Sequence, residues 1–130
     1  MCGIIGISSN KSVSANIINS LKKLEYRGYD SAGVATLFGG EINEVKSEGR
    51  VDNLEQNFDL KSLKGNIGIG HVRWATHGIP NRINAHPHSS DNVSVVHNGI
   101  IENSTILKKH LINKGHTFKS QTDTEVIVHL

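Results

Sequence analysis

A pair of glycines, Gly39 and Gly40, constrains the fold of this chain more than any other feature of its sequence. The pair separates two runs that each predict a β-strand, residues 34–38 and residues 41–46. Glycines between two such runs are typical of a tight hairpin turn, because glycine accepts the positive φ angles that these turns require. The sequence therefore predicts two adjacent antiparallel strands in its first half.

Further strands and helices surround this hairpin without regular alternation. Apolar runs predict strands at residues 3–7, 67–74 and 93–97. The spacing of apolar residues predicts helices at residues 13–24, 51–58, 106–111 and from residue 122 onward. A parallel sheet would show strand–helix–strand units in regular order. We therefore expect a single α+β domain with antiparallel strands in layers.

The composition of the chain argues against several classes of protein. The net charge is +2 and the basic residues are scattered, so we expect no binding to nucleic acid and none to a membrane. No segment reaches the roughly 18 apolar residues of a membrane span, and the first residues lack a secretory signal. A single cysteine allows no internal disulfide and is typical of a reducing cytoplasm, where we expect this chain to work.

That cysteine, Cys2, directly follows Met1. Cysteine is small enough for the initiator methionine to be removed, which would give Cys2 a free α-amino group beside its own thiol. A thiol becomes a good nucleophile when a base is near, and α-amino groups titrate near neutral pH. One residue would then provide both nucleophile and base. The structural alternative is a buried, inert cysteine on the first strand.

Three charged residues have side chains suited to binding charged groups. Arg73 ends a predicted strand, where a guanidinium can bind a carboxylate through two parallel hydrogen bonds. Arg27 lies in a predicted turn and can organise a carboxylate or a chain terminus. Asp123 can hold an ammonium group. The structural alternative for Asp123 is a helix start, because Thr122 and Glu125 around it form a capping-box pattern.

Asn98 and Gly99 follow the predicted strand 93–97. Asn-Gly is a common tight-turn pair. The same pair can direct a side-chain amide and a backbone N–H at one oxygen, which is the arrangement of an oxyanion hole. A thiol nucleophile, an oxyanion hole and clamps for a carboxylate and an ammonium group together indicate hydrolysis of the glutamine side-chain amide.

A histidine cluster raises the possibility of a metal site. His86 and His88 form a His-x-His pair within residues 75–92, a predicted loop, and His71, His77 and His97 lie nearby in the sequence. Such clusters can bind zinc. The chain has no second cysteine, no HExxH motif and no carboxylate at ligand spacing. We therefore expect no metal and no cofactor.

Six stretches of the sequence resemble one known family: CGIIG, LEYRGYDSAGVA, HVRWATHG, NAHPH, VVHNGIIEN and TDTEVIVHL. They are similar to the N-terminal glutaminase domain of the glucosamine-6-phosphate synthase family, the glutamine–fructose-6-phosphate amidotransferases. The resemblance implies an N-terminal-nucleophile hydrolase fold, an αββα sandwich with antiparallel sheets that is incomplete at the C-terminus here. Residues 1–130 would be the N-terminal part of the glutaminase domain, without the sugar isomerase domains.

The resemblance also implies roles for individual residues. Cys2 would be the nucleophile and its own amino group the base. Asn98 and Gly99 would form the oxyanion hole, and Arg27 would support the N-terminus. The implied glutamine pocket has five residues: Arg73, Trp74, Thr76, His77 and Asp123. The structural alternative for Trp74 is an aromatic residue of the core.

The reaction implied is hydrolysis of L-glutamine, through a cysteine thioester, to glutamate and ammonia. It would be the amide-donor half of glucosamine 6-phosphate synthesis from fructose 6-phosphate. One alternative is a non-catalytic fragment that binds glutamine or a partner chain. The other is the glutaminase domain of a phosphoribosylpyrophosphate amidotransferase, whose pattern differs at RGYDSAG and WATHG.

Two protein partners are expected besides glutamine. A separate chain that carries the isomerase domains is the first. The second is another copy of this chain, because an antiparallel sandwich that ends at Leu130 would leave sheet edges unpaired. Four apolar residues of the last helix would also have no later segment to cover them: Val126, Ile127, Val128 and Leu130. Exposed apolar patches favour association.

Overall fold

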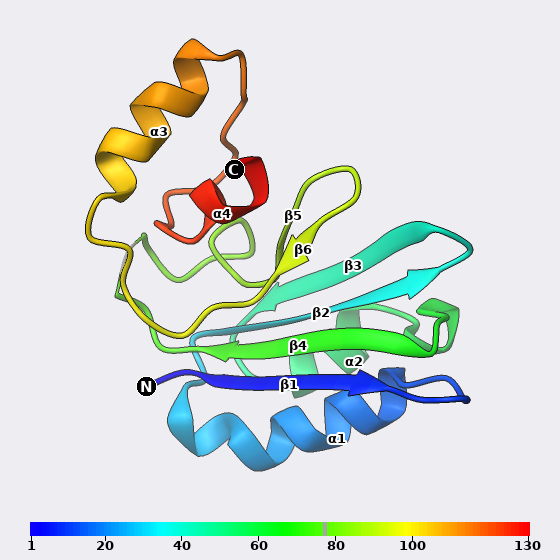
Figure 1. Cartoon of the computed structure of the whole chain (residues 1–130). Helices are drawn as coiled ribbons and strands as arrows, with labels where there is room; N and C mark the ends of the chain where they lie inside the picture. Colours follow the sequence, from blue (N-terminus) through cyan, green and yellow to red (C-terminus); the bar gives the residue numbers. More distant parts are fainter. Residues whose placement is uncertain (77) are drawn as a thin grey trace.

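The computed structural model describes residues 1–76 and 78–130, and its centre is a four-stranded sheet (Figure 1). The strands are β1 (Gly3–Ser8), β2 (Ser31–Phe38), β3 (Glu41–Glu48) and β4 (Ile67–Arg73). They lie in the order β1-β4-β2-β3, and all three pairings are antiparallel. The predicted β2–β3 hairpin is present, with φ of 60° and 80° at its two glycines.

Helices and two short strands complete the described chain. The helical segments are α1 (Ser14–Leu24), η1 (Glu25–Arg27), α2 (Asp52–Asn57), η2 (Leu60–Ser62), α3 (Ser104–Asn113) and α4 (Glu125–His129). The short strands β5 (His88–Ser89) and β6 (Ser94–Val95) pair with each other. Figure 1 shows α1 and α2 against one face of the sheet and α3 and α4 on its other side. No helix in the described ranges is long and apolar enough to cross a membrane.

The alternation of side chains along β2 and β4 gives the sheet two different faces. Val34 and Val72 point toward α1 and belong to the hydrophobic core. The core consists of ten buried residues: Val13, Ile17, Ile18, Leu21, Ala32, Val34, Val51, Leu54, Leu63 and Val72. Burying one large aliphatic side chain contributes about 1.5–3 kcal/mol to folding. The neighbours Gly33 and His71, which are paired in register, therefore face the opposite side.

Three expectations about local structure were wrong. The strand predicted at 93–97 is only two residues long, because from His97 onward the backbone leaves the β5–β6 pairing and makes contacts with β4 instead. The capping box is not formed, since Glu125 accepts hydrogen bonds from the backbone of Lys119 and Ser120. Val126 and Val128 are buried within the described chain rather than exposed.

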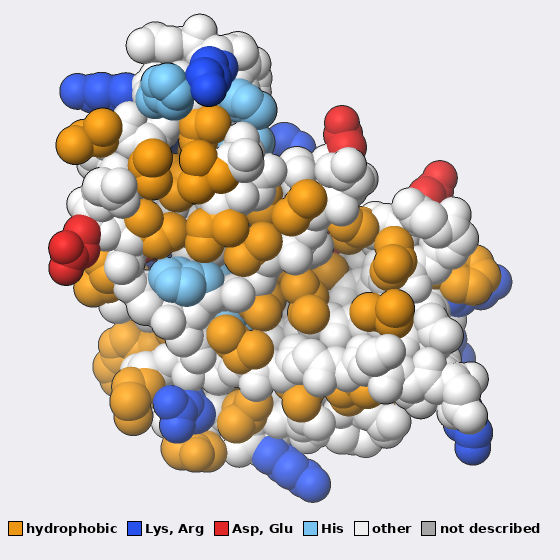
Figure 2. Space-filling view, viewed as in Figure 1, with side chains coloured by type: hydrophobic (Ala, Val, Ile, Leu, Met, Phe, Trp, Pro, Cys, Tyr) orange, Lys and Arg blue, Asp and Glu red, His pale blue; other side chains and the backbone are white. Residues whose placement is uncertain are grey.

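The open face of the sheet is partly covered. β5 and β6 contact α4 on this side. Ile4, Leu37 and Ile67 remain exposed on the strands. Figure 2 shows hydrophobic side chains over α3, α4 and the strands in this view. The exposed strand residues give this face an apolar character that bears on association.

Candidate active site

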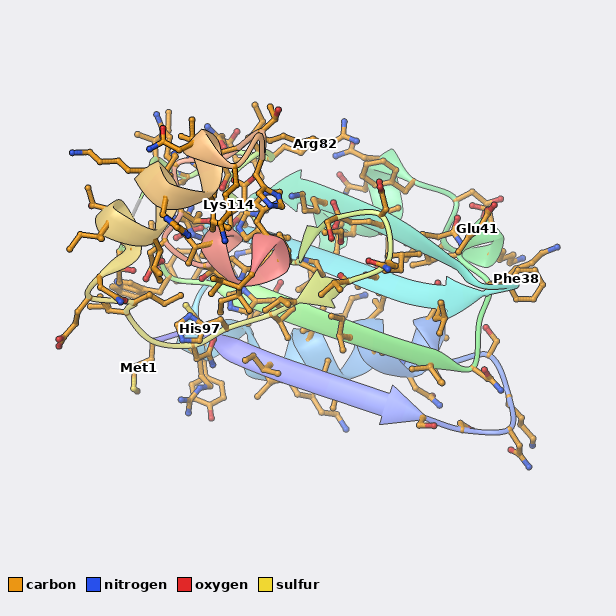
Figure 3. All side chains as sticks on the ribbon, turned by 45° about the horizontal axis from the view of Figure 1, so that its top comes forward. Met1, Phe38, Glu41, Arg82, His97 and Lys114 are labelled. Carbon is orange, nitrogen blue, oxygen red and sulfur yellow. The ribbon has the colours of Figure 1, made fainter. Side chains whose placement is uncertain are left out.

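A cavity of about 370 Å³ opens at one end of the sheet, where β1 begins and β4 ends. Figure 3 shows the labelled residues Met1 and His97 at this end and Phe38 and Glu41, of the hairpin, at the other. Eight of the nine predicted site residues line the cavity: Cys2, Arg27, Arg73, Trp74, Thr76, Asn98, Gly99 and Asp123. The ninth, His77, lies outside the described residues.

The antiparallel pairing of β1 with β4 places the thiol at this end. Gly3 is opposite Val72, so the residues just outside the pairing, Cys2 and Trp74, come together. The Trp74 backbone N–H donates a hydrogen bond to Cys2 Sγ, with 3.1 Å between nitrogen and sulfur. Cys2 is only partly buried and is a free thiol. The Cys2 thiol also donates a hydrogen bond to the Trp74 carbonyl oxygen, at 3.4 Å. These two contacts fix the sulfur beside the end of β4.

Two side chains hold Cys2 by its carbonyl oxygen. Arg27 Nε donates to this oxygen at 3.0 Å, and Asn98 Nδ2 donates to it at 3.1 Å. The predicted contact between Arg27 and the N-terminal segment is therefore present in the structure. The second contact brings the Asn98 amide beside the cysteine, where an oxyanion donor is needed.

The backbone at Gly99 has a conformation that favours glycine. Its φ is 148°, and a Cβ here would lie 3.0 Å from His97 Nε2. Asn98, the residue before Gly99, is hydrogen-bonded to His71 on β4. The His71 Nε2 atom lies 3.0 Å from Asn98 Oδ1 and 3.3 Å from the carbonyl oxygen of His97. The pair Asn98–Gly99 is thus fixed at the cavity wall by local backbone geometry and by β4.

Arg73 and Asp123 place opposite charges on the cavity wall. Arg73 is only 3% exposed, and its guanidinium donates to the carbonyl oxygens of Gly78 and Ile79 at 3.1 and 3.3 Å. Asp123 is also buried, and its Oδ2 accepts a hydrogen bond from the Ile101 backbone N–H at 2.6 Å. These bonds to backbone fix the position of each charge before any ligand arrives.

Trp74 lies at the cavity mouth and not in the core. Its side chain is 52% exposed, so the structural alternative of a core aromatic is wrong. Tyr29 contacts its ring edge-on, with ring centroids 6.4 Å apart. Tyr29 in turn makes a cation–π contact with Arg50, whose guanidinium carbon lies 5.0 Å from the centroid of the Tyr29 ring. An exposed indole supported in this way can cover a small substrate.

Three histidines form a buried layer next to the cavity, and one of them, His86, lines it. The rings of His71 and His86 stack with centroids 4.2 Å apart, and His88 contacts His86 edge-on at 4.7 Å. Burial lowers the pKa of His71 to about 4 and that of His88 to about 3, and it also lowers the pKa of His86. All three are therefore neutral at pH 7. Within the described residues, no group of three or more His, Cys, Asp or Glu side chains is arranged to hold a metal ion.

Several site residues were not predicted from the sequence. Asp30 accepts hydrogen bonds from the Ala75 backbone N–H and from the Ser31 hydroxyl, and its own N–H donates to the Arg73 carbonyl. It thereby fixes the strand end that carries Trp74. Six further residues line the cavity: Met1, His86, His97, Ile100, Thr122 and Thr124. The available signal for Asp30 was its place in the RGYDSAG stretch.

A second cavity, of about 450 Å³, lies elsewhere and has different chemistry. Lys46 and Glu44 line it, and their charged groups are 3.5 Å apart. Lys46 also donates to the Pro87 carbonyl at 3.1 Å, and burial lowers its pKa. The residues that line this cavity include no cysteine. The cavity with the thiol is therefore the better candidate for catalysis.

Comparison with known proteins agrees with this chemistry. Residues 58–130 match the family described as Glutamine amidotransferase domain, which is more than half of the chain. The chain belongs to this glutamine amidotransferase family. Its relatives include proteins named "Glutamine--fructose-6-phosphate aminotransferase [isomerizing]" from Mesorhizobium japonicum, Pyrococcus horikoshii and Clostridium acetobutylicum, at 57%, 56% and 59% identity. All of this chain aligns with them, but it spans only 21–22% of their length.

Two solved structures have the same fold. One is a glutamine phosphoribosylpyrophosphate amidotransferase from B. subtilis, with a TM-score of 0.84 and 32% identity. Another is titled an allosteric regulatory enzyme of purine biosynthesis, with a TM-score of 0.85 and 33% identity. Each comparison covers all of this chain and 29% of the other. The expected N-terminal-nucleophile hydrolase fold with antiparallel sheets is confirmed.

Proposed function

We propose that this glutamine amidotransferase domain hydrolyses the side-chain amide of L-glutamine with Cys2 as the nucleophile. The observation that carries the proposal is the convergence of four groups on one cavity: the Cys2 thiol, the Asn98–Gly99 pair, the Arg73 guanidinium and the Asp123 carboxylate. The first two suit acyl transfer, and the last two match the α-carboxylate and α-ammonium groups of an amino acid.

The proposed mechanism begins after removal of Met1. The free amino group of Cys2 takes the thiol proton, and the thiolate attacks the amide carbon of glutamine. The carbonyl oxygen becomes an oxyanion, which accepts hydrogen bonds from the Gly99 N–H and the Asn98 amide. When the carbon–nitrogen bond breaks, the proton from the Cys2 amine passes to the departing ammonia. Water then hydrolyses the thioester, which releases glutamate and restores the thiol.

Asn98 can serve the oxyanion without leaving Cys2. Its amide nitrogen carries two N–H groups. One of them donates to the Cys2 carbonyl oxygen. The other is available for the oxyanion, so binding of the intermediate does not require the first hydrogen bond to break.

Arg73 and Asp123 would hold the two charged ends of the amino acid, and Trp74, Thr76 and His77 would complete the pocket.

We propose that residues 1–130 form the N-terminal part of this domain. A reactive thiol needs reducing surroundings, so we place the reaction in the cytoplasm. Because the relatives named as fructose-6-phosphate aminotransferases are far more similar than the phosphoribosylpyrophosphate enzyme, we propose that the ammonia serves glucosamine 6-phosphate synthesis, with isomerase domains as the partner.

Reaction with a glutamine-like electrophile tests the proposal. We expect a diazo-ketone analogue of glutamine to add once, at Cys2, to chains that have lost Met1, and intact-mass and peptide analysis would locate the adduct. Cys2→Ala should lose both the adduct and ammonia release. An adduct at another residue, or unchanged ammonia release in Cys2→Ala, would contradict the proposal. Glutamine binding without any turnover would favour the non-catalytic alternative.

A further inference from the structure

His71 contacts the oxyanion-hole residue from behind. It lies on β4 with no exposed surface, and it faces the side of the sheet that carries the cavity. Its Nε2 atom is 3.0 Å from Asn98 Oδ1 and 3.3 Å from the His97 carbonyl oxygen. His71 itself is not among the residues that line the cavity. It can therefore influence the reaction only through another residue.

The partners of His71 determine where its proton lies. Both atoms near Nε2 are carbonyl-type oxygens, which accept hydrogen bonds and cannot donate them. Nε2 must therefore carry the hydrogen. The other ring nitrogen, Nδ1, is buried and has no hydrogen-bond partner among the described residues. A proton at Nδ1 would have no acceptor there, so the ring is held as the neutral Nε2–H tautomer.

This hydrogen bond selects one orientation of the Asn98 amide. A side-chain amide can rotate by half a turn, which exchanges its oxygen and its nitrogen. With the His71 donor behind it, the oxygen faces β4 and the nitrogen faces Cys2. In the reversed orientation, two N–H donors would meet at His71, and a carbonyl oxygen would face the developing oxyanion. The donor at His71 thus decides whether Asn98 attracts or repels that charge.

The His71 ring is itself held rigidly. The His86 ring stacks on it at 4.2 Å, with an angle of only 14° between the planes. Gly33, which is paired with His71 in register, leaves the room for this stack, because a Cβ on Gly33 would lie 2.0 Å from the His86 carbonyl oxygen. A donor with so little freedom loses little entropy when it orients its acceptor.

We propose that His71 is a positioning residue, which fixes the Asn98 amide with its nitrogen toward the oxyanion by donating a hydrogen bond from Nε2 to Asn98 Oδ1. The inference deepens the proposed function and rests on it. The hydrogen bond from His71 should affect the chemical step, because the intermediate bears the oxyanion and the bound substrate does not.

Two amide substitutions separate this role from simple packing. The nitrogen of glutamine can reach the place of Nε2 and donate from it, whereas the shorter asparagine can reach only the place of Nδ1. We expect His71→Gln to keep kcat for glutamine hydrolysis within about threefold of the unchanged chain. We expect His71→Asn to lower kcat by about 100–1000-fold, the range for loss of one oxyanion-hole donor. KM should change less than about threefold in both variants.

His88→Gln is the matched control, because His88 belongs to the same buried layer but contacts Thr122 instead of Asn98. It should keep kcat near that of the unchanged chain. Equal kcat values in His71→Gln and His71→Asn, or an effect confined to KM, would overturn the inference. So would a kcat loss in His88→Gln as large as that in His71→Asn.

A second measurement does not depend on activity or on the folding of a variant. Nitrogen and carbon NMR shifts of the His71 ring in the unchanged chain report its tautomer directly. We expect the neutral Nε2–H form at pH 7, and a neutral Nδ1–H form or a charged ring would overturn the inference. If the unchanged chain releases no ammonia but shows the Nε2–H form, the proposed hydrolysis fails while the hydrogen bond to Asn98 stands.

Discussion

Asp123 combines a structural contact with the substrate-binding task that we propose for it. One carboxylate oxygen accepts the Ile101 N–H, which anchors the segment after Gly99 to the start of α4. The same residue lines the cavity that also contains Cys2. Removal of the whole side chain would therefore disturb structure and recognition together, and a sharper substitution is needed to separate them.

Asp123→Asn removes the charge and keeps an oxygen that can accept the Ile101 N–H. We expect the variant to fold normally and to show a KM for glutamine at least about thirtyfold higher, because loss of one partner of a desolvated charge pair costs about 2 kcal/mol or more. Its kcat should fall less than its KM rises. Initial rates of ammonia release over a range of glutamine concentrations would measure both quantities.

Asp91→Asn is the control for this change, because Asp91 is exposed and does not line the cavity. This variant loses one negative charge as well, but at a position away from the cavity, so its KM for glutamine should be unchanged. If Asp123→Asn is active with an unchanged KM, Asp123 has only the structural task, and the ammonium group of glutamine is bound elsewhere.

Residues that the sequence marked through a local motif line the cavity, and their roles stay predictions. Cys2 was marked by its position after Met1, and Asn98 by the Gly99 that follows it. Asp30 and His71 were not assigned to the site, because their partners are distant in sequence. Asp30 binds Ala75, 45 residues away, and His71 binds Asn98, 27 residues away. Only the pairing of the strands brings such partners together.

At the level of elements, the long amphipathic helix and the hairpin were predictable because each follows from local periodicity and turn chemistry. The ends of shorter elements were not. β6 stops at Val95, because the chain beyond it is bonded to His71 and, through the His97 ring, to Thr124. α4 begins at Glu125 without a side-chain cap, because the Glu125 carboxylate instead accepts the N–H groups of residues 119 and 120. Tertiary contacts override local signals in both cases.

The close packing of β2 against the His86 segment gives a direct test at this scale. Gly33→Ala would put a Cβ 2.0 Å from the His86 carbonyl oxygen, so the strand or the segment must move. We expect the free energy of unfolding to fall by about 1–3 kcal/mol, as for other overpacked sites. Urea denaturation followed by circular dichroism would measure the change.

Gly6→Ala provides the comparison on β1. Its added Cβ would have only one neighbour within 4 Å, Ile69 Cγ2 at 3.9 Å, which is an ordinary contact. Alanine also loses less backbone entropy than glycine on folding, so this variant should be as stable as the unchanged chain or slightly more stable. Equal stability of Gly33→Ala and Gly6→Ala would show that the His86 segment shifts at no cost.

On the scale of the whole molecule, the two sides of the sheet differ in how well they are covered. One side is closed by α1 and α2, and the other leaves Ile4, Leu37 and Ile67 exposed. β1 and β3 are the outer strands of the described sheet. Apolar strands and unpaired edges both favour contact with another chain. The sequence predicted association from unpaired sheet edges and from the apolar residues of the last helix. Val126 and Val128 of that helix are buried, so the expectation now rests mainly on the strands.

We expect the chain to self-associate at micromolar concentration through this face. Light scattering should give a mass above that of one chain, and Ile67→Glu should reduce it to that of a monomer. Ile106→Glu makes the same change at an exposed position on α3 and should leave the mass unchanged. A monomeric unchanged chain, or equal effects of the two substitutions, would contradict the prediction.

The way Cys2 is held has a consequence for how the protein would mature. The carbonyl oxygen of Cys2 accepts hydrogen bonds from Arg27 and Asn98, and its sulfur accepts one from the Trp74 N–H. None of these three contacts involves the α-nitrogen of Cys2. Met1 is 76% exposed, which leaves it accessible to a peptidase. Under the proposed mechanism, the newly made chain would be a precursor whose site is assembled in advance. Activation would be the cleavage of one peptide bond, with no rearrangement of the residue that it sets free.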